Sequence, residues 1–107
     1  MSEWHVAYTD KAKADLKHLN GSVKSQVVTA IRKVSKNPLP RQEGGYGIAL
    51  GNRSGMDLSG CCKIKLKRIG IRIVYELKRT ERGLEIVIIG ARADNEVYEE
   101  AFRRLGR

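Results

Sequence analysis

This sequence of 107 residues has only two cysteines and two histidines, so few residues can form disulfide bonds or bind a soft metal ion. Cys61 and Cys62 are neighbours, and a disulfide between neighbours is strained and closes almost no loop. A disulfide scaffold is therefore excluded, and free thiols fit a reducing compartment. His5 and His18 are distant from each other and from the two cysteines in the sequence. These four residues are therefore a poor zinc site. We expect the chain to hold no metal and no other cofactor.

Long apolar runs and acidic residues are also scarce. The longest apolar run, Ile86–Ile89, is far too short to cross a bilayer, and the first residues lack the pattern of a secretory signal. We therefore expect a cytoplasmic protein with no membrane partner. Twelve Asp and Glu stand against 21 Lys and Arg, and the resulting net charge of +9 attracts polyphosphate strongly. A nucleic acid or an acidic protein is the expected partner.

The residues that are present suffice for one packed domain. Hydrophobic residues make up 41% of the chain and charged residues 31%, which excludes collagen-like, disordered and membrane-spanning classes. A chain of 107 residues has no room for a second core. We expect a single domain over residues 1–107.

Hydrophobic periodicity predicts a strand and two helices in the first third of the chain. Residues 4–8 alternate as in a half-buried strand. Apolar residues then recur at helical spacing over residues 10–19 and over residues 22–36. The Thr9-Asp10 pair can cap the first of these helices, and Ser22 can cap the second. Because the link between them is short, the two helices are expected to pair as an antiparallel hairpin.

A glycine-rich segment, residues 39–60, separates these helices from the second half of the chain. A loop this long in a small domain is functional or contains a short strand, for which residues 46–50 are the best candidate. The run Gly44-Gly45-Tyr46-Gly47 suggests a phosphate cradle, but no strand precedes it and no helix follows it. We therefore interpret this run as a flexible connector.

The next segment predicts an antiparallel hairpin that turns near Ile69-Gly70. Apolar residues alternate with basic ones over residues 62–66, and the alternation resumes after the turn. Because side chains alternate between the two faces of a strand, Lys63, Lys65 and Arg72 share the face opposite the core.

The last third of the chain predicts a buried strand and a helix. Residues 84–89 are almost continuously apolar, as in a strand buried on both faces. Asp94 or Asn95 can cap a helix that follows. The pattern as a whole thus predicts helices near both ends of the chain, with most of the strands between them.

The crowded cations indicate a binding surface. Like charges on one strand face repel one another, so Lys63, Lys65 and Arg72, with Arg92 at the end of the last strand, favour a surface that a polyanion covers. A lysine-rich edge that discourages aggregation is the alternative. No carboxylate pair has the spacing of a glycosidase or a two-metal nuclease, and neither histidine lies in the context of a catalytic triad.

A site built from cations can cleave RNA, because RNA carries its own nucleophile, the 2′-hydroxyl beside each phosphate. The reaction needs a base for that proton, positive charge for the phosphorane and a proton for the departing 5′-oxygen. Lysine and arginine neutralise the charge, and a lysine among other cations can serve as the base. An aromatic ring can hold a nucleotide by stacking.

Four short runs together resemble the RelE branch of the RelE/ParE toxin superfamily: GCCKIKL (60–66), GIRIVYE (70–76), GAR (90–92) and EVY (96–98). The resemblance covers essentially the whole chain. It implies a microbial RNase-like α+β fold, in which an N-terminal helical hairpin and a C-terminal helix cover a small antiparallel sheet. It also implies a type II toxin that acts as an mRNA interferase. Such a toxin contacts the ribosome and its 16S rRNA, cleaves mRNA in the ribosomal A site and is neutralised by a cognate antitoxin.

The resemblance also implies a role for each matching residue. Lys65 matches the family's general base, Lys63 and Arg72 its phosphate and transition-state stabilisers, Arg92 the arginine that assists the leaving group, and Tyr98 the tyrosine that stacks on the nucleotide. The expected RNA-binding residues are Lys63, Lys67, Arg68, Arg72 and Tyr98.

Two alternatives remain open at this point. ParE-type relatives inhibit DNA gyrase by protein binding and generally lack the catalytic set, whereas a non-catalytic RNA-binding module would use the basic face only for phosphate contacts. The chain also departs from the RelE pattern twice. Its glycine-rich stretch, residues 44–60, is longer, which is expected to alter contacts with the ribosome or the antitoxin. Cys62 stands where the family commonly has an aromatic residue, which is expected to change the local packing.

Overall fold

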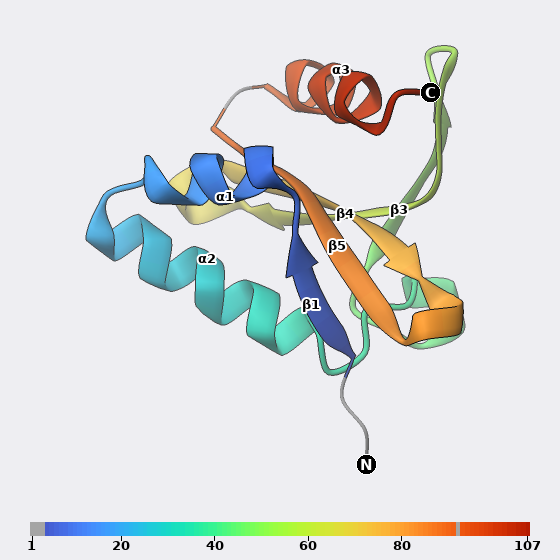
Figure 1. The fold of residues 1–107 in the computed structure, drawn as a ribbon, viewed down its shortest axis with the longest axis horizontal. Coiled ribbons are helices and arrows are strands. Elements are labelled where there is room, and N and C mark those ends of the chain that lie inside the picture. The colour runs from blue at the N-terminus through green and yellow to red at the C-terminus, as the bar shows by residue number, and fades with distance from the viewer. Residues whose placement is uncertain (1–3, 92) are drawn as a thin grey trace.

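A five-stranded sheet carries helices on both of its faces in the computed structural model, which describes residues 4–91 and 93–107 (Figure 1). The expected α+β class is confirmed. No helix within the described residues is long and apolar enough to cross a membrane. The elements in chain order are β1 (His5–Tyr8), α1 (Asp10–Lys17), α2 (Gly21–Val34), β2 (Ile48–Arg53), β3 (Met56–Leu66), β4 (Ile71–Lys78), β5 (Gly83–Gly90) and α3 (Asp94–Leu105).

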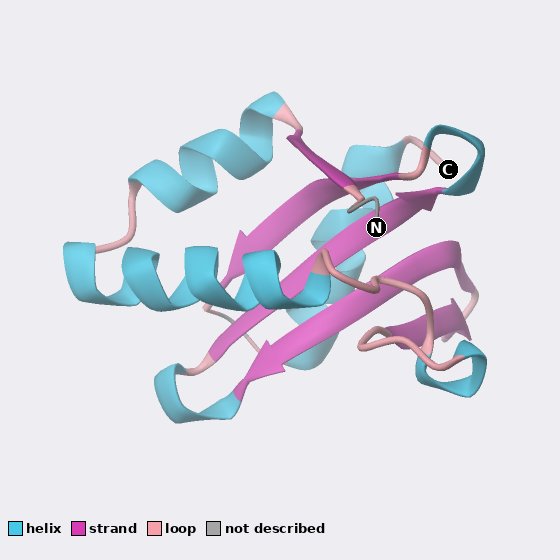
Figure 2. Ribbon diagram, turned by 90° about the horizontal axis from the view of Figure 1, so that it is seen from below, coloured by secondary structure: helices cyan, strands magenta, loops and turns pink. Residues whose placement is uncertain are grey.

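Side chains cap the first two helices, whose early amides have no partner inside the helix. Thr9 accepts a hydrogen bond from the amide of Ala12 at 3.0 Å, as expected. Asn20 accepts one from the amide of Val23 at 3.0 Å, so the predicted cap Ser22 is wrong. Asn20 has the extended backbone that a cap requires, and the helix has already begun when the chain reaches Ser22. The two helices lie on the same side of the sheet (Figure 2).

The strands lie in the order β1-β5-β4-β3-β2, with the predicted β3–β4 hairpin near the middle. All neighbours are antiparallel except β1 and β5, which run parallel. The sheet is therefore mixed, and the expectation of an antiparallel sheet is wrong for β1. A parallel pair needs a long crossover rather than a tight turn, and α1, α2 and the other three strands supply it.

The glycine-rich segment contains the expected short strand. It forms β2, which begins at Ile48 rather than at residue 46, and then the first half of β3. A 3₁₀ turn, Arg41–Glu43, and a dense set of backbone hydrogen bonds hold the residues before β2. Residues 44–47 are therefore an ordered loop and not the flexible connector that we expected.

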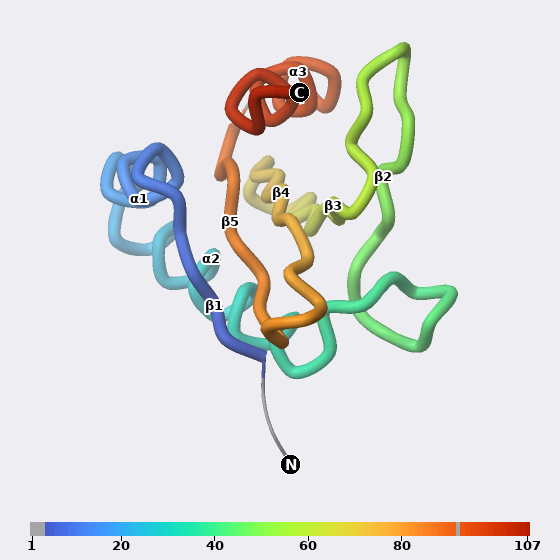
Figure 3. The backbone as a smooth tube through the Cα atoms, turned by 45° about the vertical axis from the view of Figure 1, so that its right-hand side comes forward, coloured from blue at the N-terminus to red at the C-terminus, as the bar shows by residue number. Residues whose placement is uncertain are grey.

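Two apolar cores lie on opposite faces of the sheet, so the expectation that the chain has no room for a second core is wrong. One lies under α1 and α2, and it receives Ile73 and Tyr75 from β4. The other lies under α3, and it receives Val74 from the same strand. Figure 3 shows α3 apart from α1 and α2, across the sheet. Strands β4 and β5 are buried on both faces, as predicted for residues 84–89.

Ion pairs fix α3 to the sheet and to α1. Arg104 donates hydrogen bonds to the carboxylate of Asp15 at 2.7 Å and to the carbonyl oxygen of Val87 at 3.0 Å. The same carboxylate accepts a hydrogen bond from the amide of Ile89 at 3.0 Å. At the C-terminal end, Arg107 forms an ion pair with Glu76 at 2.7 Å. The C-terminal end of α3 is thereby held to α1, β4 and β5.

Candidate functional site

The basic face of the β3–β4 hairpin is the candidate site. Lys65 lies directly opposite Arg72 in the register, and Lys63 lies two residues away on the same face of β3. The residue opposite Lys63 is Val74, which packs in the core under α3. The prediction that Lys63, Lys65 and Arg72 share one face is therefore confirmed. The expectation that this face lies away from any core is wrong, because Val74 packs there under α3.

A carboxylate from α3 lies between two of these cations. Lys65 Nζ is 3.3 Å from Asp94 Oδ2, and Arg72 Nε donates to Asp94 Oδ1. The hydrogen bond from Arg72, and then that from Lys65, lowers the pKa of Asp94. The side chains of Lys65 and Arg72 are 29% and 21% exposed, so solvent still reaches the site. The site is therefore not the purely cationic cluster that the strand pattern predicts.

Asp94 was not predicted as a member of the site, because the sequence pattern indicates this residue only as a helix cap. The N-cap of α3 is Ala93, which has no side-chain hydrogen bond, so the predicted caps Asp94 and Asn95 are wrong. Asp94 is the first residue of the helix, and its carboxylate bonds to the strand cations instead. Only the packing of α3 on the sheet reveals this contact.

Tyr98 lies in the core under α3 and is 1% exposed. In this structure the ring is therefore not presented to solvent as the expected stacking role requires. Leu50 of β2 and Leu58 of β3 also lie in this core. The β2–β3 hairpin therefore buries a face of α3 that is wider than the positions of Val97 and Ala101. Within the described chain, the hydroxyl of Tyr98 has no hydrogen-bond partner.

Two cations lie over the Tyr98 ring. The Lys63 ammonium is 5.5 Å from the ring centroid, and the Arg53 guanidinium of β2 is 5.1 Å from it. Arg53 is a second residue that sequence reasoning missed, because the glycine-rich segment gave no sign of which side chains would turn toward α3. The structure therefore joins Lys63, Tyr98 and Arg53 into one cluster beside the Asp94 ion pairs.

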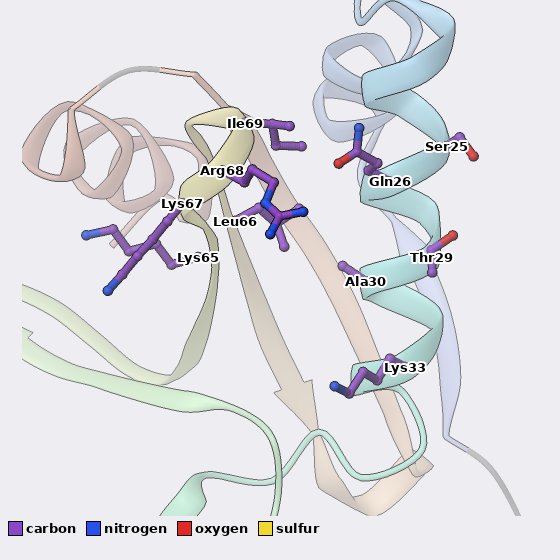
Figure 4. Close-up of a pocket in the computed structure, with 10 residues that line it drawn as sticks. All are labelled: Ser25, Gln26, Thr29, Ala30, Lys33, Lys65, Leu66, Lys67, Arg68 and Ile69. Carbon is purple, nitrogen blue, oxygen red and sulfur yellow. The ribbon is translucent and has the colours of Figure 1, made fainter.

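The other predicted residues have different positions. Lys67 and Arg68 lie exposed in the 3₁₀ turn between β3 and β4. Arg68 points toward α2, across a cavity of about 490 Å³, whereas Lys65 and Lys67 point away from α2 (Figure 4). Arg68 is thus separated from the basic face. Arg92 lies outside the described residues.

No group of three or more His, Cys, Asp or Glu that could hold a metal ion is found in residues 4–91 and 93–107. Cys61 and Cys62 are free and buried. Burial raises the pKa of the Cys61 thiol to about 11, which keeps it protonated at neutral pH.

Comparisons with known proteins agree with this arrangement. The family described as ParE toxin of type II toxin-antitoxin system, parDE, matches residues 6–96. The mRNA interferase toxin RelE of Escherichia coli is 26% identical over 102 residues, which are 95% of this chain and 97% of that protein.

Solved structures of the same toxin are similar in fold. A mutant of E. coli RelE in the free state has a TM-score of 0.73 at 23% identity and covers 97% of this chain and 99% of its own. A mutant of RelE in complex with an antitoxin RelBc peptide has a TM-score of 0.65 at 26% identity, with coverage of 92% and 93%.

Proposed function

We propose that this chain, which belongs to the family of ParE toxins of type II toxin–antitoxin systems, is an mRNA interferase that cuts mRNA in the ribosomal A site. The observation that carries the proposal is the placing of Lys63, Lys65 and Arg72 on one face of the β3–β4 hairpin. The relative named mRNA interferase toxin RelE supports it. A face of this kind suits a phosphate that gains charge during reaction.

The proposed reaction is a transesterification within the RNA. Lys65 accepts the proton of a 2′-hydroxyl, and that oxygen attacks the adjacent phosphorus. Lys63 and Arg72 neutralise the charge that builds on the phosphorane oxygens. The bond to the 5′-oxygen then breaks, and this oxygen takes up a proton with the assistance of Arg92. The products are a 2′,3′-cyclic phosphate and a 5′-hydroxyl.

Two features of α3 oppose the binding of RNA at this site. A phosphate that contacts Lys65 and Arg72 has to compete with the carboxylate of Asp94, which bonds to both cations. Tyr98 can stack on a nucleotide only if its ring leaves the core in which it is buried. The proposal therefore requires the N-terminal half of α3 to move when mRNA binds.

The partners in this proposal are A-site mRNA, the ribosome with its 16S rRNA, and a cognate antitoxin. The antitoxin is supported by the relative solved with an antitoxin RelBc peptide. The net charge of +9 favours an antitoxin that offers an acidic, amphipathic segment. Co-expression with the product of a neighbouring small open reading frame tests this partner, and persistent toxicity in its presence would exclude that product.

Primer extension on mRNA in a purified translation system tests the activity. The Lys65→Ala variant should lose cleavage by a factor of at least about 100, which is the lower range for removal of a general base. Lys13→Ala is the matched control, because this exposed lysine lies on α1, on the opposite face of the sheet. A-site cuts that need ribosomes, persist in Lys13→Ala and vanish in Lys65→Ala are the expected result.

Equal cleavage by the wild type and the Lys65→Ala variant would contradict the proposed base. Intact mRNA together with inhibited DNA gyrase would establish the alternative that the ParE name of the family favours. Salt-dependent RNA binding without cleavage would instead identify a non-catalytic RNA-binding module.

A further inference from the structure

A second cavity, of about 400 Å³, lies beside the basic face at an open edge of β3. The pairing of β2 with β3 ends at Ile48 and Lys63, so the last residues of β3 have no strand beside them on this side. Five of the lining residues are polar or aromatic: Arg41, Tyr46, Lys63, Lys65 and Lys67. Because Lys63 and Lys65 line both this cavity and the candidate active site, a strand of RNA can pass directly from one to the other.

Tyr46 presents an aromatic ring at this cavity. Its side chain is 49% exposed although the residue is large and apolar. The Lys33 ammonium of α2 lies 5.7 Å from the ring centroid. An exposed aromatic ring next to cations is the usual platform on which a single-stranded nucleic acid stacks a base.

The loop holds this ring in place before any ligand arrives. The amide of Tyr46 donates a hydrogen bond to the carbonyl oxygen of Asn37 at 2.9 Å. A Cβ added at Gly45 would collide with the backbone of Leu39, and one added at Gly47 would collide with the hydroxyl of Tyr75. The two glycines flanking Tyr46 therefore allow a close packing that fixes the loop, which lowers the entropy cost of binding.

The cations of the cavity are available to a phosphate. Among the described residues, neither Arg41 nor Lys67 forms an ion pair, and both are exposed. Lys65, in contrast, is engaged by Asp94. A phosphate that enters here replaces only water on Arg41 and Lys67, so its charge is neutralised without breaking an existing contact.

We propose that this cavity binds the mRNA nucleotide adjacent to the cleaved one, with its base stacked on Tyr46 and its phosphate between Arg41 and Lys67. The subsite deepens the proposed function and rests on it for the identity of the RNA strand. At this subsite the chain can bind mRNA without any movement of α3. The glycine-rich run around Tyr46 thus acquires a role that the sequence alone left open.

The test measures RNA binding and cleavage separately. Binding is followed by fluorescence anisotropy with a labelled RNA oligonucleotide, methylated at each 2′-oxygen so that it cannot be cut, at low salt and without ribosomes. Tyr46→Ala should weaken binding by a factor of about 5 to 150, the effect of losing one stacked base. Tyr46→Phe keeps the ring and should retain the affinity of the wild type. Arg41→Ala and Lys67→Ala should weaken binding, whereas Lys13→Ala should not.

The cleavage assay then separates this proposal from the proposed function. In ribosomal mRNA cleavage, Tyr46→Ala should raise KM and leave kcat nearly unchanged, because the ring binds substrate equally in the ground and transition states. Cleavage with unaltered KM and unaltered oligonucleotide binding in Tyr46→Ala would refute the subsite and leave the proposed function standing. Tyr46-dependent binding without any cleavage would support the subsite and refute the proposed function. A wild type that neither binds the oligonucleotide nor cleaves mRNA on the ribosome would refute both.

Discussion

Asp94 is the residue with the greatest effect on the electrostatics of the candidate site. Its carboxylate bonds to Lys65 and Arg72, where the scissile phosphate of the proposed reaction has to bind. These two hydrogen bonds lower the pKa of Asp94, so the competing anion stays charged at neutral pH. The resting site thus contains an internal competitor for its substrate.

Removal of this charge should improve the binding of RNA. Asp94→Asn keeps the shape of the side chain and removes the anion. We therefore expect KM for mRNA cleavage to fall roughly fivefold, as for the loss of two partly exposed ion pairs. Glu96→Gln is the control, because it removes an equal charge from an exposed position in the first turn of the same helix. An equal fall in both variants would show that long-range charge, rather than occupancy of the site, is responsible.

Helix α3 is the element that the sequence predicted least well. The alternation of β3 and β4 was sufficient to place Lys63, Lys65 and Arg72 on one face, because a strand has a fixed period of two. No such rule gives the contacts of α3, which depend on how the β2–β3 hairpin closes over it. The burial of Tyr98 and the ion pairs of Asp94 are consequences of that packing, so periodicity alone could not predict them.

The ion pair between Arg104 and Asp15 should be essential for the docking of α3. Their side chains are 11% and 19% exposed, and Asp15 also holds the amide of Ile89. Arg104→Ala leaves a nearly buried carboxylate with one partner fewer, and we expect the free energy of unfolding in urea to fall by about 2 to 4 kcal/mol. Arg103→Ala, at a side chain that is 70% exposed, should cost less than about 1 kcal/mol. Equal losses in both variants would contradict this role for Arg104.

The molecule as a whole has two cores that share one sheet. Strands β4 and β5 contribute side chains to both cores, so the two cores are coupled through the sheet. The tight packing of both faces on the same backbone is the condition for a single cooperative transition in a small domain.

Unfolding of the wild type should therefore occur in one step. Trp4, the single tryptophan, packs against the core under α1 and α2, and its fluorescence reports on that face. Far-UV circular dichroism includes the contribution of α3 on the other face. The two signals should have the same midpoint in urea, and an earlier loss of circular dichroism would show that α3 unfolds separately.

The parallel pairing of β1 with β5 also governs the order in which the chain can fold during synthesis. Thr9, at the end of β1, donates a hydrogen bond to the carbonyl oxygen of Val87, 78 positions later. Contacts between such distant segments form late, because the loop between them must close first. A ribosome that makes this chain therefore releases almost all of it before the sheet is complete, and a product that stops short of β5 leaves β1 without its neighbour.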